Sequence, residues 1–203
     1  MSLSGADAGD FEIRNETELY FTGASPDYEA KSTYNVTVSA DDTSVGGTPD
    51  ASQNFTLNIT DVNEAPIAQN DTNGSDEVSE AGSLLIIGLV PGDPTATGNV
   101  LDNDSDPDAG DTLSNVGVAA GTPGTAPNSG VGNAIEGTYG TLTIASGGTW
   151  NYELDNDDPD TDDLVAGETA NDLFTYAVAD SHGAISTAVV TITIHGEDDI
   201  LSL

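Results

Sequence analysis

Oxygen-bearing side chains crowd together at residues 61–66, which read Asp-Val-Asn-Glu-Ala-Pro. Asp61, Asn63 and Glu64 stand in this stretch, directly before its proline. The preceding residues, 55–60, alternate apolar and polar side chains with a period of two, which is the pattern of a half-buried strand. Calcium takes about six to eight hard oxygen ligands in a flexible geometry. An acidic stretch that follows a strand supplies several of them, so we expect a calcium site at a joint between two domains.

The overall charge also points to cations. The chain of 203 residues has 36 acidic residues and two basic residues, Arg14 and Lys31, so its formal net charge is −34. Such a charge opposes compaction unless cations neutralise it. It excludes nucleic acid as a partner, because phosphate binding needs Lys and Arg, and it argues against anionic membrane surfaces. Two explanations stay open, specific divalent cations and a salt-adapted acidic surface, and the clustering of the acids favours the first.

The residue types that are missing restrict the class of protein further. The chain has no cysteine, which excludes disulfides and thiolate metal sites. No apolar run is long enough to span a membrane and no signal peptide precedes the first domain, so we expect no membrane insertion. We expect the sequence to be an excerpt of a larger protein.

The elements that must position these residues are strands. Val, Ile, Thr and Tyr are abundant, and no stretch shows sustained helical periodicity. Short alternating runs divided by Gly, Asn and Asp predict an all-β sandwich. The expected strands are residues 11–13, 19–21, 34–40, 55–60, 84–90, 112–118, 138–145, 149–154, 173–179 and 186–195.

These strands predict two unequal domains. Residues 1–63 hold fewer strands than the roughly seven of a complete immunoglobulin-like sandwich, so we expect a partial repeat there. Residues 64–196 are long enough to be complete, and residues 197–203 begin the next linker or a tail. Residues 121–132, rich in Gly, Pro and Asn, are expected to form a mobile loop. Because a half-sandwich exposes unpaired edges, we expect an edge-paired or strand-swapped homophilic dimer.

The linker and the segment before it resemble cadherin repeats. Residues 61–66 are similar to the Asp-x-Asn-Asp-x-Ala-Pro linker of that family, with Glu64 where the family usually has Asp. The Asp27-Tyr28-Glu29 run resembles the cadherin Asp-Arg-Glu element, with Tyr in place of Arg. Residues spaced i and i+2 point the same way if the chain is extended. A solvated turn is the plainer interpretation of this run.

The second segment resembles the VCBS repeats of large bacterial surface proteins, often adhesins of the RTX type. The matching motifs occur in order at residues 100–106 (Val-Leu-Asp-Asn-Asp-Ser-Asp), 139–144 (Tyr-Gly-Thr-Leu-Thr-Ile), 148–152 (Gly-Thr-Trp-Asn-Tyr) and 174–176 (Phe-Thr-Tyr), followed by Asp180. The resemblance implies tandem cadherin-like, immunoglobulin-like Greek-key β-sandwiches. It also implies an extracellular, cell-surface adhesion module whose Ca²⁺ ions rigidify a joint, with neighbouring repeats of the same protein as partners.

The resemblance further implies the metal ligands. Asp104 and Asp106 match the cadherin Asp-Ala-Asp element, and Asp180 closes a strand. The expected set for the central joint is Asp27, Glu29, Asp61, Asn63, Glu64, Asp104, Asp106 and Asp180. Outer joints would use Asp42 on one side and Glu80, Asp198 and Asp199 on the other.

Alternatives remain for two acidic runs. Residues 102–111, with Asp102 and Asp108, also admit a self-contained calcium loop. This loop is no EF-hand, because Pro107 takes the position of the required Gly and Leu113 that of the closing Glu. Residues 155–163 are more simply a solvated hairpin tip.

Two other function classes fit these residues less well. A sandwich face or the Gly-rich loop could bind polysaccharide, but aromatic residues are only 5% of the chain and are needed for the core. An enzyme is not expected, because glycosidase chemistry needs one carboxyl group in an apolar pocket, whereas these acids crowd on loops. The adjacent Ser181 and His182 cannot form a catalytic relay, which needs residues that converge in space.

Overall fold

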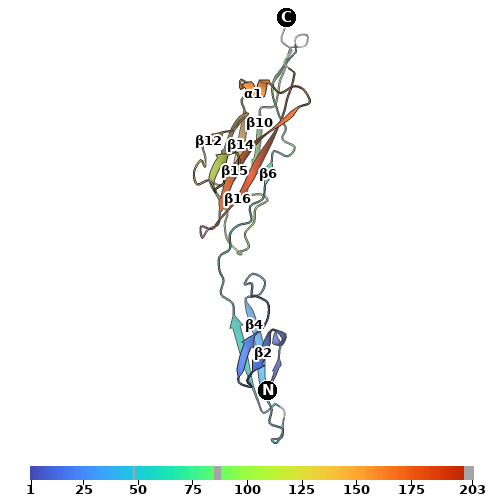
Figure 1. Ribbon diagram of the computed structural model, residues 1–203, viewed down its shortest axis with the longest axis vertical. Helices are drawn as coiled ribbons and strands as arrows, with labels where there is room; N and C mark the ends of the chain where they lie inside the picture. The colour runs from blue at the N-terminus through green and yellow to red at the C-terminus, as the bar shows by residue number, and fades with distance from the viewer. Residues whose placement is uncertain (48, 85–87, 199–203) are drawn as a thin grey trace. The chain divides into compact units, whose positions relative to one another are not determined.

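A computed structural model describes residues 1–47, 49–84 and 88–198, and the chain divides into two compact units (Figure 1). Unit 1 is Met1–Val62 and unit 2 is Asn63–Leu203. Each unit is described by itself. Both are built from β-strands, and the described helices are the short α1 (Pro159–Asp162) and one 3-10 turn (Ala8–Asp10).

Unit 1 consists of a small sheet and a hairpin. Three antiparallel strands lie in the order β1-β4-β5, and β2 pairs with β3. Their bounds are β1 Ser2–Ser4, β2 Phe11–Arg14, β3 Glu18–Phe21, β4 Thr33–Ala40 and β5 Ala51–Asn58.

Aromatic contacts hold the hairpin on the sheet. The Phe21 ring lies 5.4 Å from that of Phe11 and 5.0 Å from that of Tyr34 on β4, edge to face in both cases. Asp7 pairs with Lys31 and accepts a hydrogen bond from the backbone N–H of Asn35 at 2.6 Å. These contacts fix the segment before β2 against β4.

Unit 2 is a sandwich of two sheets. One sheet has the order β10-β14-β13-β12, the other has the order β11-β15-β16-β6, and β7 also pairs with β16. A separate hairpin joins β8 to β9. The bounds are β6 Asp71–Thr72, β7 Val78–Ser79, β8 Gly82–Leu84, β9 Gly88–Val90, β10 Thr95–Asn99, β11 Ser114–Ala120, β12 Ala134–Glu136, β13 Gly140–Ile144, β14 Thr149–Leu154, β15 Thr169–Ala179 and β16 Ile185–His195.

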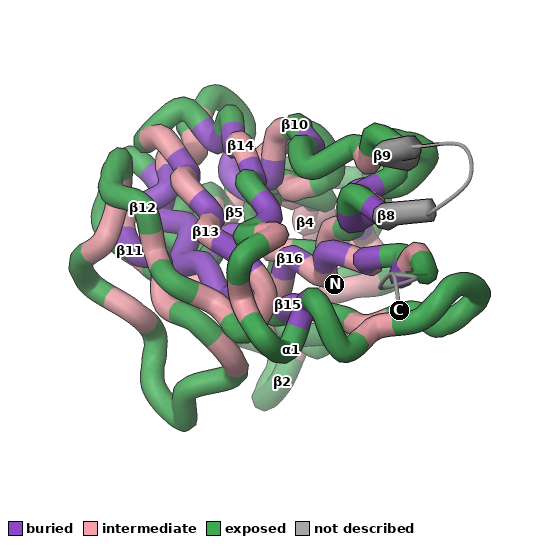
Figure 2. The backbone as a smooth tube through the Cα atoms, turned by 90° about the horizontal axis from the view of Figure 1, so that it is seen from above, coloured by how far each residue is buried: buried purple, intermediate pink, exposed green. Residues whose placement is uncertain are grey.

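The core of unit 2 lies between the two sheets, where the buried residues concentrate along β13 to β16 (Figure 2). Tyr152, Phe174 and Tyr176 are fully buried. Trp150 is only 5% exposed. A Cβ atom at Gly98 would lie 2.7 Å from the indole ring, so only glycine fits above this side chain. The expectation that Trp150 belongs to the core is confirmed.

Most expected strands form, with shifted ends. Residues 149–154 form β14 with the predicted bounds, and β16 begins one residue before the predicted 186. The single strand predicted at 84–90 is wrong, because the described residues form the antiparallel strands β8 and β9; residues 85–87 lie outside the described part. The loop 121–132 is tied to β11 by a hydrogen bond from the N–H of Val118 to the carbonyl of Ser129. In the described residues no helix is both long and apolar enough to cross a membrane.

Candidate metal centre

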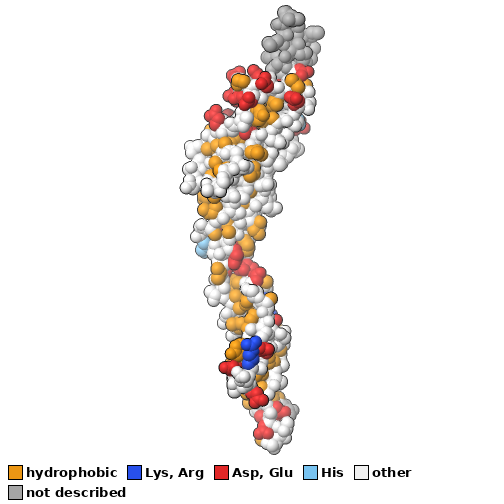
Figure 3. Space-filling view, in the orientation of Figure 1, with side chains coloured by type: hydrophobic (Ala, Val, Ile, Leu, Met, Phe, Trp, Pro, Cys, Tyr) orange, Lys and Arg blue, Asp and Glu red, His pale blue; other side chains and the backbone are white. Residues whose placement is uncertain are grey.

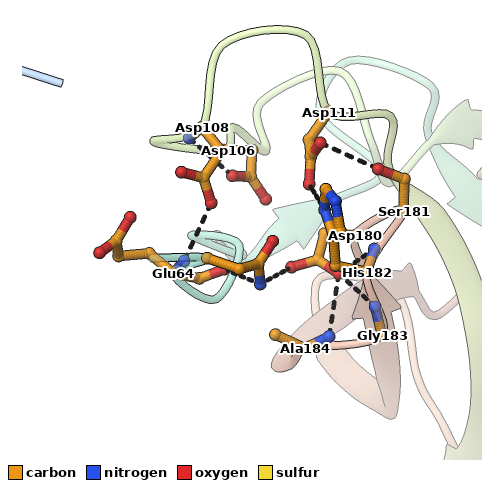
Figure 4. Close-up of polar contacts among 10 residues, drawn as sticks. Glu64, Asp106, Asp108, Asp111, Asp180, Ser181, His182, Gly183 and Ala184 are labelled. Atoms are coloured by element: carbon orange, nitrogen blue, oxygen red, sulfur yellow. Dashed lines mark hydrogen bonds and ion pairs between the residues drawn. The ribbon is translucent and has the colours of Figure 1, made fainter. Parts of the chain in front are cut away.

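A tight loop after β10 brings three carboxylates together. Asp106 accepts a hydrogen bond from the backbone N–H of Asp108 at 2.9 Å, and the N–H of Asp111 donates to the carbonyl of Asp108 at 3.2 Å. Gly110 has a φ of +104°, a conformation that a side chain disfavours, and there the chain turns back. One carboxylate oxygen from each of the three acids then lies within 4.8 Å of the others (Figure 4).

Two oxygen atoms of this group lack a partner. Asp108 Oδ1 and Asp106 Oδ2 are buried and accept no hydrogen bond in the described part of the chain. The Asp108 side chain belongs to a residue that is only 9% exposed. Burying an ionised carboxylate costs several kcal/mol unless a donor or a cation compensates it. The geometry therefore suits a hard divalent cation, for which carboxylate oxygens are the preferred ligands.

The beginning of unit 2 is fixed to this loop. The backbone N–H of Glu64 donates to Asp108 Oδ2 at 2.9 Å, and the Asn63 amide donates to Asp180 Oδ2 at 2.8 Å (Figure 4). The expected ligands Asn63, Glu64, Asp106 and Asp180 are thus brought to one place.

Asp180 ends β15 and is held by the turn that follows. Its Oδ1 atom accepts the backbone N–H groups of His182, Gly183 and Ala184 at 2.8, 2.5 and 2.9 Å. The hydrogen bond from Asn63 and these backbone donors lower the pKa of Asp180 below its ordinary value. The carboxylate therefore stays ionised, as a cation ligand must.

Asp111 links the loop to the same turn. Its two oxygens contact Ser181 Oγ and His182 Nδ1, each at 2.9 Å. The Asp111 carboxylate raises the pKa of the His182 imidazole. Asp111, Asp180 and His182 also form a group whose ligand atoms lie within 4.8 Å of one another. Both Ser181 and His182 are engaged by Asp111, so Asp111 connects the two halves of the site.

Asp104 lies in a different cluster. Its carboxylate accepts the N–H of Gln69 at 2.7 Å and lies 3.3 Å from the Tyr176 hydroxyl. The same hydroxyl lies 2.9 Å from Asp71 Oδ2. Burial raises the pKa of Asp71 to about 6, and the charge of Asp104 adds to this effect. Asp104 and Asp106 thus have different hydrogen-bond partners, and their shared role as ligands of one joint stays a prediction.

The acids of unit 1 show one clear departure from expectation. Residues 28–30 form a turn, so Asp27 and Glu29 do not lie in an extended segment. The carboxylate of Asp27 accepts the N–H of Ala30 at 3.0 Å, and its carbonyl accepts that of Lys31 at 2.9 Å. Asp side chains favour such turns because they replace a backbone acceptor. Asp61 is exposed near the end of unit 1.

The acids assigned to outer joints have other hydrogen-bond partners. Asp42 accepts the hydroxyl and the N–H of Ser44 at 2.7 and 2.9 Å, and these bonds lower its pKa. Glu80 is 2% exposed and accepts the N–H of Glu197 at 2.9 Å. Asp198 accepts the N–H of Ala166 at 3.2 Å. Asp102 is exposed, and Asp199 lies outside the described residues.

Sequence reasoning missed Asp111 and His182 and gave Asp108 only a secondary place. Both aspartates lie inside the run 102–111, whose sequence also admits a self-contained calcium loop. The glycine directly before Asp111 was the available signal, because it allows the chain to return toward Asp106. No comparable signal marks His182, because it lies far from Asp111 in the sequence and the two residues meet only in the folded chain.

Comparison with known proteins places most of unit 2 in a sequence family. Residues 63–196 match the family described as bacterial cadherin-like domain. No curated protein matches the chain at a significant level. This match and the packed sheets confirm the predicted all-β, cadherin-like, immunoglobulin-like fold.

Several solved cadherin structures are similar to the chain. The protocadherin gammaB7 EC3-6 cis-dimer structure is 19% identical with a TM-score of 0.45, over 95% of this chain and 40% of that chain. Human protocadherin-24 EC1-2 is 18% identical with a TM-score of 0.47, over 98% and 81%. Mouse cadherin-23 EC22-24 is 15% identical with a TM-score of 0.45, over 96% and 52%. The chain thus spans less than half of the protocadherin gammaB7 chain.

Proposed function

The chain belongs to the bacterial cadherin-like domain family through residues 63–196, and from this premise we propose that it is an extracellular adhesion or structural module that binds calcium where unit 2 begins. The observation that carries the proposal is the pair of buried, unpartnered oxygens on Asp106 and Asp108. A carboxylate pair of this kind needs a cation to offset the lost hydration. Calcium suits the site because its ligands are oxygens in an irregular, loop-built arrangement.

The proposed ligands of unit 2 have different roles. Asp106, Asp108 and Asp111 provide the carboxylates that converge. Asn63 and Glu64 bring the beginning of unit 2 against them, and Asp180 anchors Asn63. Cation binding would then fix the first residues of unit 2 on the loop after β10.

We propose that the preceding unit completes the site. Asp27, Glu29 and Asp61 are the candidates, and their support is the sequence pattern of the linker. Calcium at this position would limit the motion between neighbouring repeats and neutralise part of the −34 charge. The ordered motifs of the second segment support its further assignment to VCBS-type repeats of an RTX-type surface adhesin.

Carbohydrate binding is not the favoured function. A sugar-binding face needs exposed aromatic rings, and Trp150, Tyr152 and Tyr176 of unit 2 are all buried in the core. The acids of the site crowd on loops with several carboxylates, which suits cation binding better than acid–base catalysis.

Calcium titration by calorimetry tests the proposal. The wild-type protein should bind with a Kd of about 10⁻⁴ to 10⁻³ M, typical of extracellular modules. Asp108→Asn, which removes one charge and keeps the shape, should weaken binding at least about tenfold, the equivalent of about 1.4 kcal/mol. Asp160→Asn removes the same charge from an exposed residue of α1 and should bind like the wild type. Equal affinities of all three proteins would contradict the assignment.

The role of the joint needs a separate measurement. Small-angle scattering of the whole chain should give a larger and better-defined maximum dimension after calcium is added. Asp61→Asn, in the linker, should reduce this change while binding to Asp106 and Asp108 persists. Calcium binding without any change in dimension would restrict the site to unit 2.

A further inference from the structure

The sequence contains one asparagine that is followed by glycine, in Asn73-Gly74. The backbone nitrogen of the next residue can attack the side-chain carbonyl carbon of an asparagine, which closes a succinimide ring and releases ammonia. A glycine in the next position favours this attack, because it has no Cβ atom that hinders ring closure. Water then opens the ring at either of its carbonyl carbons and leaves aspartate or isoaspartate. Asn73 is therefore the asparagine whose neighbour favours deamidation most.

The fold places Asn73 at a gap in the pairing of β16. The short strands β6 and β7 pair parallel with β16 at residues 190–191 and 194–195. Between these two pairings the Asn73 side chain takes over. Its Oδ1 atom accepts the N–H of Thr193 at 3.0 Å, and its Nδ2 atom donates to the carbonyl of Thr193 at 3.2 Å. The amide side chain thus replaces the backbone of a strand beside Thr193.

The same contacts keep Asn73 from reacting while the pairing lasts. Nδ2 also donates to the carbonyl of Asp76 at 2.8 Å, and Asn73 is only 8% exposed. The attacking nitrogen is engaged as well, because the N–H of Gly74 donates to Thr72 Oγ1 at 3.1 Å. Ring closure needs both groups to leave these partners and rotate toward each other. The segment from β6 to β7 must therefore leave β16 before the reaction can occur.

Few bonds hold this segment in place. β6 and β7 are each two residues long. Segments with few backbone bonds open locally more often than the core of a domain. A further contact comes from Asp76, whose Oδ2 atom accepts the N–H and the hydroxyl of Thr97 on β10 at 2.8 and 3.3 Å. Asp76 is exposed, so this contact can be removed without a change in the core.

The product of the reaction does not fit the gap. An aspartate side chain has no donor in the position of Nδ2. Its second oxygen would face the carbonyls of Asp76 and Thr193, which are both acceptors. Isoaspartate also lengthens the backbone between β6 and β7. Either product therefore opposes the return of the segment to β16.

We propose that Asn73 is a deamidation site that is gated by the pairing of the β6–β7 segment with β16. The reaction takes place when the segment opens, and the product then keeps it from closing. A local opening that would otherwise reverse is made permanent by one covalent step. The backbone of β16 at Thr193 loses its partner as a result, which leaves this part of the sheet edge open.

Mass spectrometry of the whole chain, incubated at alkaline pH with a calcium chelator, tests the gate. Asn73 should deamidate at least about tenfold more slowly in the folded wild type than in urea, where the segment is unpaired. Asp76→Ala removes the contact with Thr97 and should raise the folded rate at least about threefold. Asp76→Asn keeps an oxygen that accepts from Thr97 and should react like the wild type. Each folded rate is compared with the rate of the same variant in urea, so that effects on the chemistry itself cancel.

The Asn73→Asp variant tests the consequence of the reaction, because it carries one of the two products. The backbone amide of Thr193 should exchange its hydrogen at least about tenfold faster in this variant than in the wild type. Asn171→Asp is the matched control. Asn171 lies opposite Thr193 on β15, and its Oδ1 atom accepts the Thr193 hydroxyl, a contact that aspartate retains. The Thr193 amide should therefore exchange in Asn171→Asp as it does in the wild type.

Several results would overturn the proposal. One is an equal deamidation rate of Asn73 in the folded chain and in urea, and another is an Asp76→Ala variant that reacts no faster than Asp76→Asn. Wild-type protection of the Thr193 amide in Asn73→Asp would show that the product closes again. Deamidation in urea that spares Asn73 and occurs elsewhere, for example at the exposed Asn128, would place the reactive site elsewhere. The chelator makes all of these results independent of the proposed calcium site.

Discussion

Units 1 and 2 use the same strand chemistry but differ in how much of it they bury. Among the buried hydrophobic residues of the described chain, Val36 is the one that lies in unit 1, and the others belong to unit 2. Unit 2 closes two sheets around Tyr152, Phe174 and Tyr176. Unit 1 instead rests on a few aromatic contacts and on Lys31 paired with Asp7. A small domain buries a smaller share of its surface and is marginal unless something else supports it.

The two units also carry different electrostatic loads. Both cations of the chain, Arg14 and Lys31, belong to unit 1, so unit 2 has no basic side chain other than its histidines. In Figure 3 acidic side chains gather at the end of unit 2 that carries α1. Because its core is large, unit 2 tolerates exposed and even buried carboxylates. Among the described residues, unit 1 has no core of comparable size.

Removing an aromatic ring should cause the largest difference between the two units in lost unfolding free energy. Phe174→Ala removes a fully buried ring from unit 2 and should cost about 3–5 kcal/mol of its unfolding free energy. Phe55→Ala removes a ring of the same size that is 46% exposed, and should cost unit 1 less than about 1 kcal/mol. Urea unfolding can follow unit 2 through Trp150, the only tryptophan, and unit 1 through hydrogen exchange on β4. Similar losses of unfolding free energy in the two variants would contradict the difference in burial between the two units.

Calcium should stabilise unit 2 by less than the Phe174→Ala substitution destabilises it. At a calcium concentration about 100 times the Kd, binding adds about 2.7 kcal/mol. For a chain of this size that raises the melting temperature by about 5–10 °C. The Trp150 fluorescence transition should show this shift in the wild type, and Asp108→Asn should largely lose it. An equal shift in Asp108→Asn would mean that calcium stabilises the molecule through general charge screening.

The stability of the two units should change with pH in opposite directions. This is the smallest of the expected effects. In unit 2 burial raises the pKa of Asp71 to about 6, above the unfolded value of about 3.9. Its contribution to stability is therefore complete below about pH 4 and is lost as the pH rises through 6. In unit 1 the ion pair with Lys31 lowers the pKa of Asp7. That contribution is present above about pH 4 and is lost as the pH falls through the lower folded value.

The Asp71→Asn variant measures how much the titration of Asp71 contributes to the pH dependence of unit 2 stability. Because Asp71 is partly exposed, solvent screening reduces the expected gain to about 1 kcal/mol at pH 7.5, and no gain should remain near pH 4. Trp150 unfolding curves in the presence of a chelator would measure the difference between variant and wild type at each pH. A constant difference across this range would show that Asp71 does not titrate near pH 6.

The alternating strands were predictable because burial on one face leaves a direct trace in the sequence. Residues 149–154 alternate clearly and form β14 with the expected ends. The strands β6 and β7 were not predictable, because an alternation of apolar and polar residues cannot be recognised in two residues. They form by pairing with β16. The prediction of one strand at 84–90 is wrong because a continuous apolar stretch does not show where one strand ends and the next begins.

The site was predictable in its composition but not in its pairing. Asn63 donates to Asp180, the N–H of Glu64 donates to Asp108, and the N–H of Asp108 donates to Asp106, while the role of these residues as metal ligands stays a prediction. Asp104 stands two positions before Asp106 and yet contacts the Tyr176 hydroxyl, whereas Asp106 accepts the N–H of Asp108. Local hydrogen bonds, which spacing does not encode, decide which carboxylate faces the cluster.

Crystals of the whole chain grown with calcium test the central claim most directly. The account predicts an anomalous peak within about 2.3–2.6 Å of Asp108 Oδ1 and Asp106 Oδ2. In Asp108→Asn crystals soaked under the same conditions, that peak should be lost or much weaker. Calcium bound only at other carboxylates, with both oxygens still unpartnered, would contradict the account.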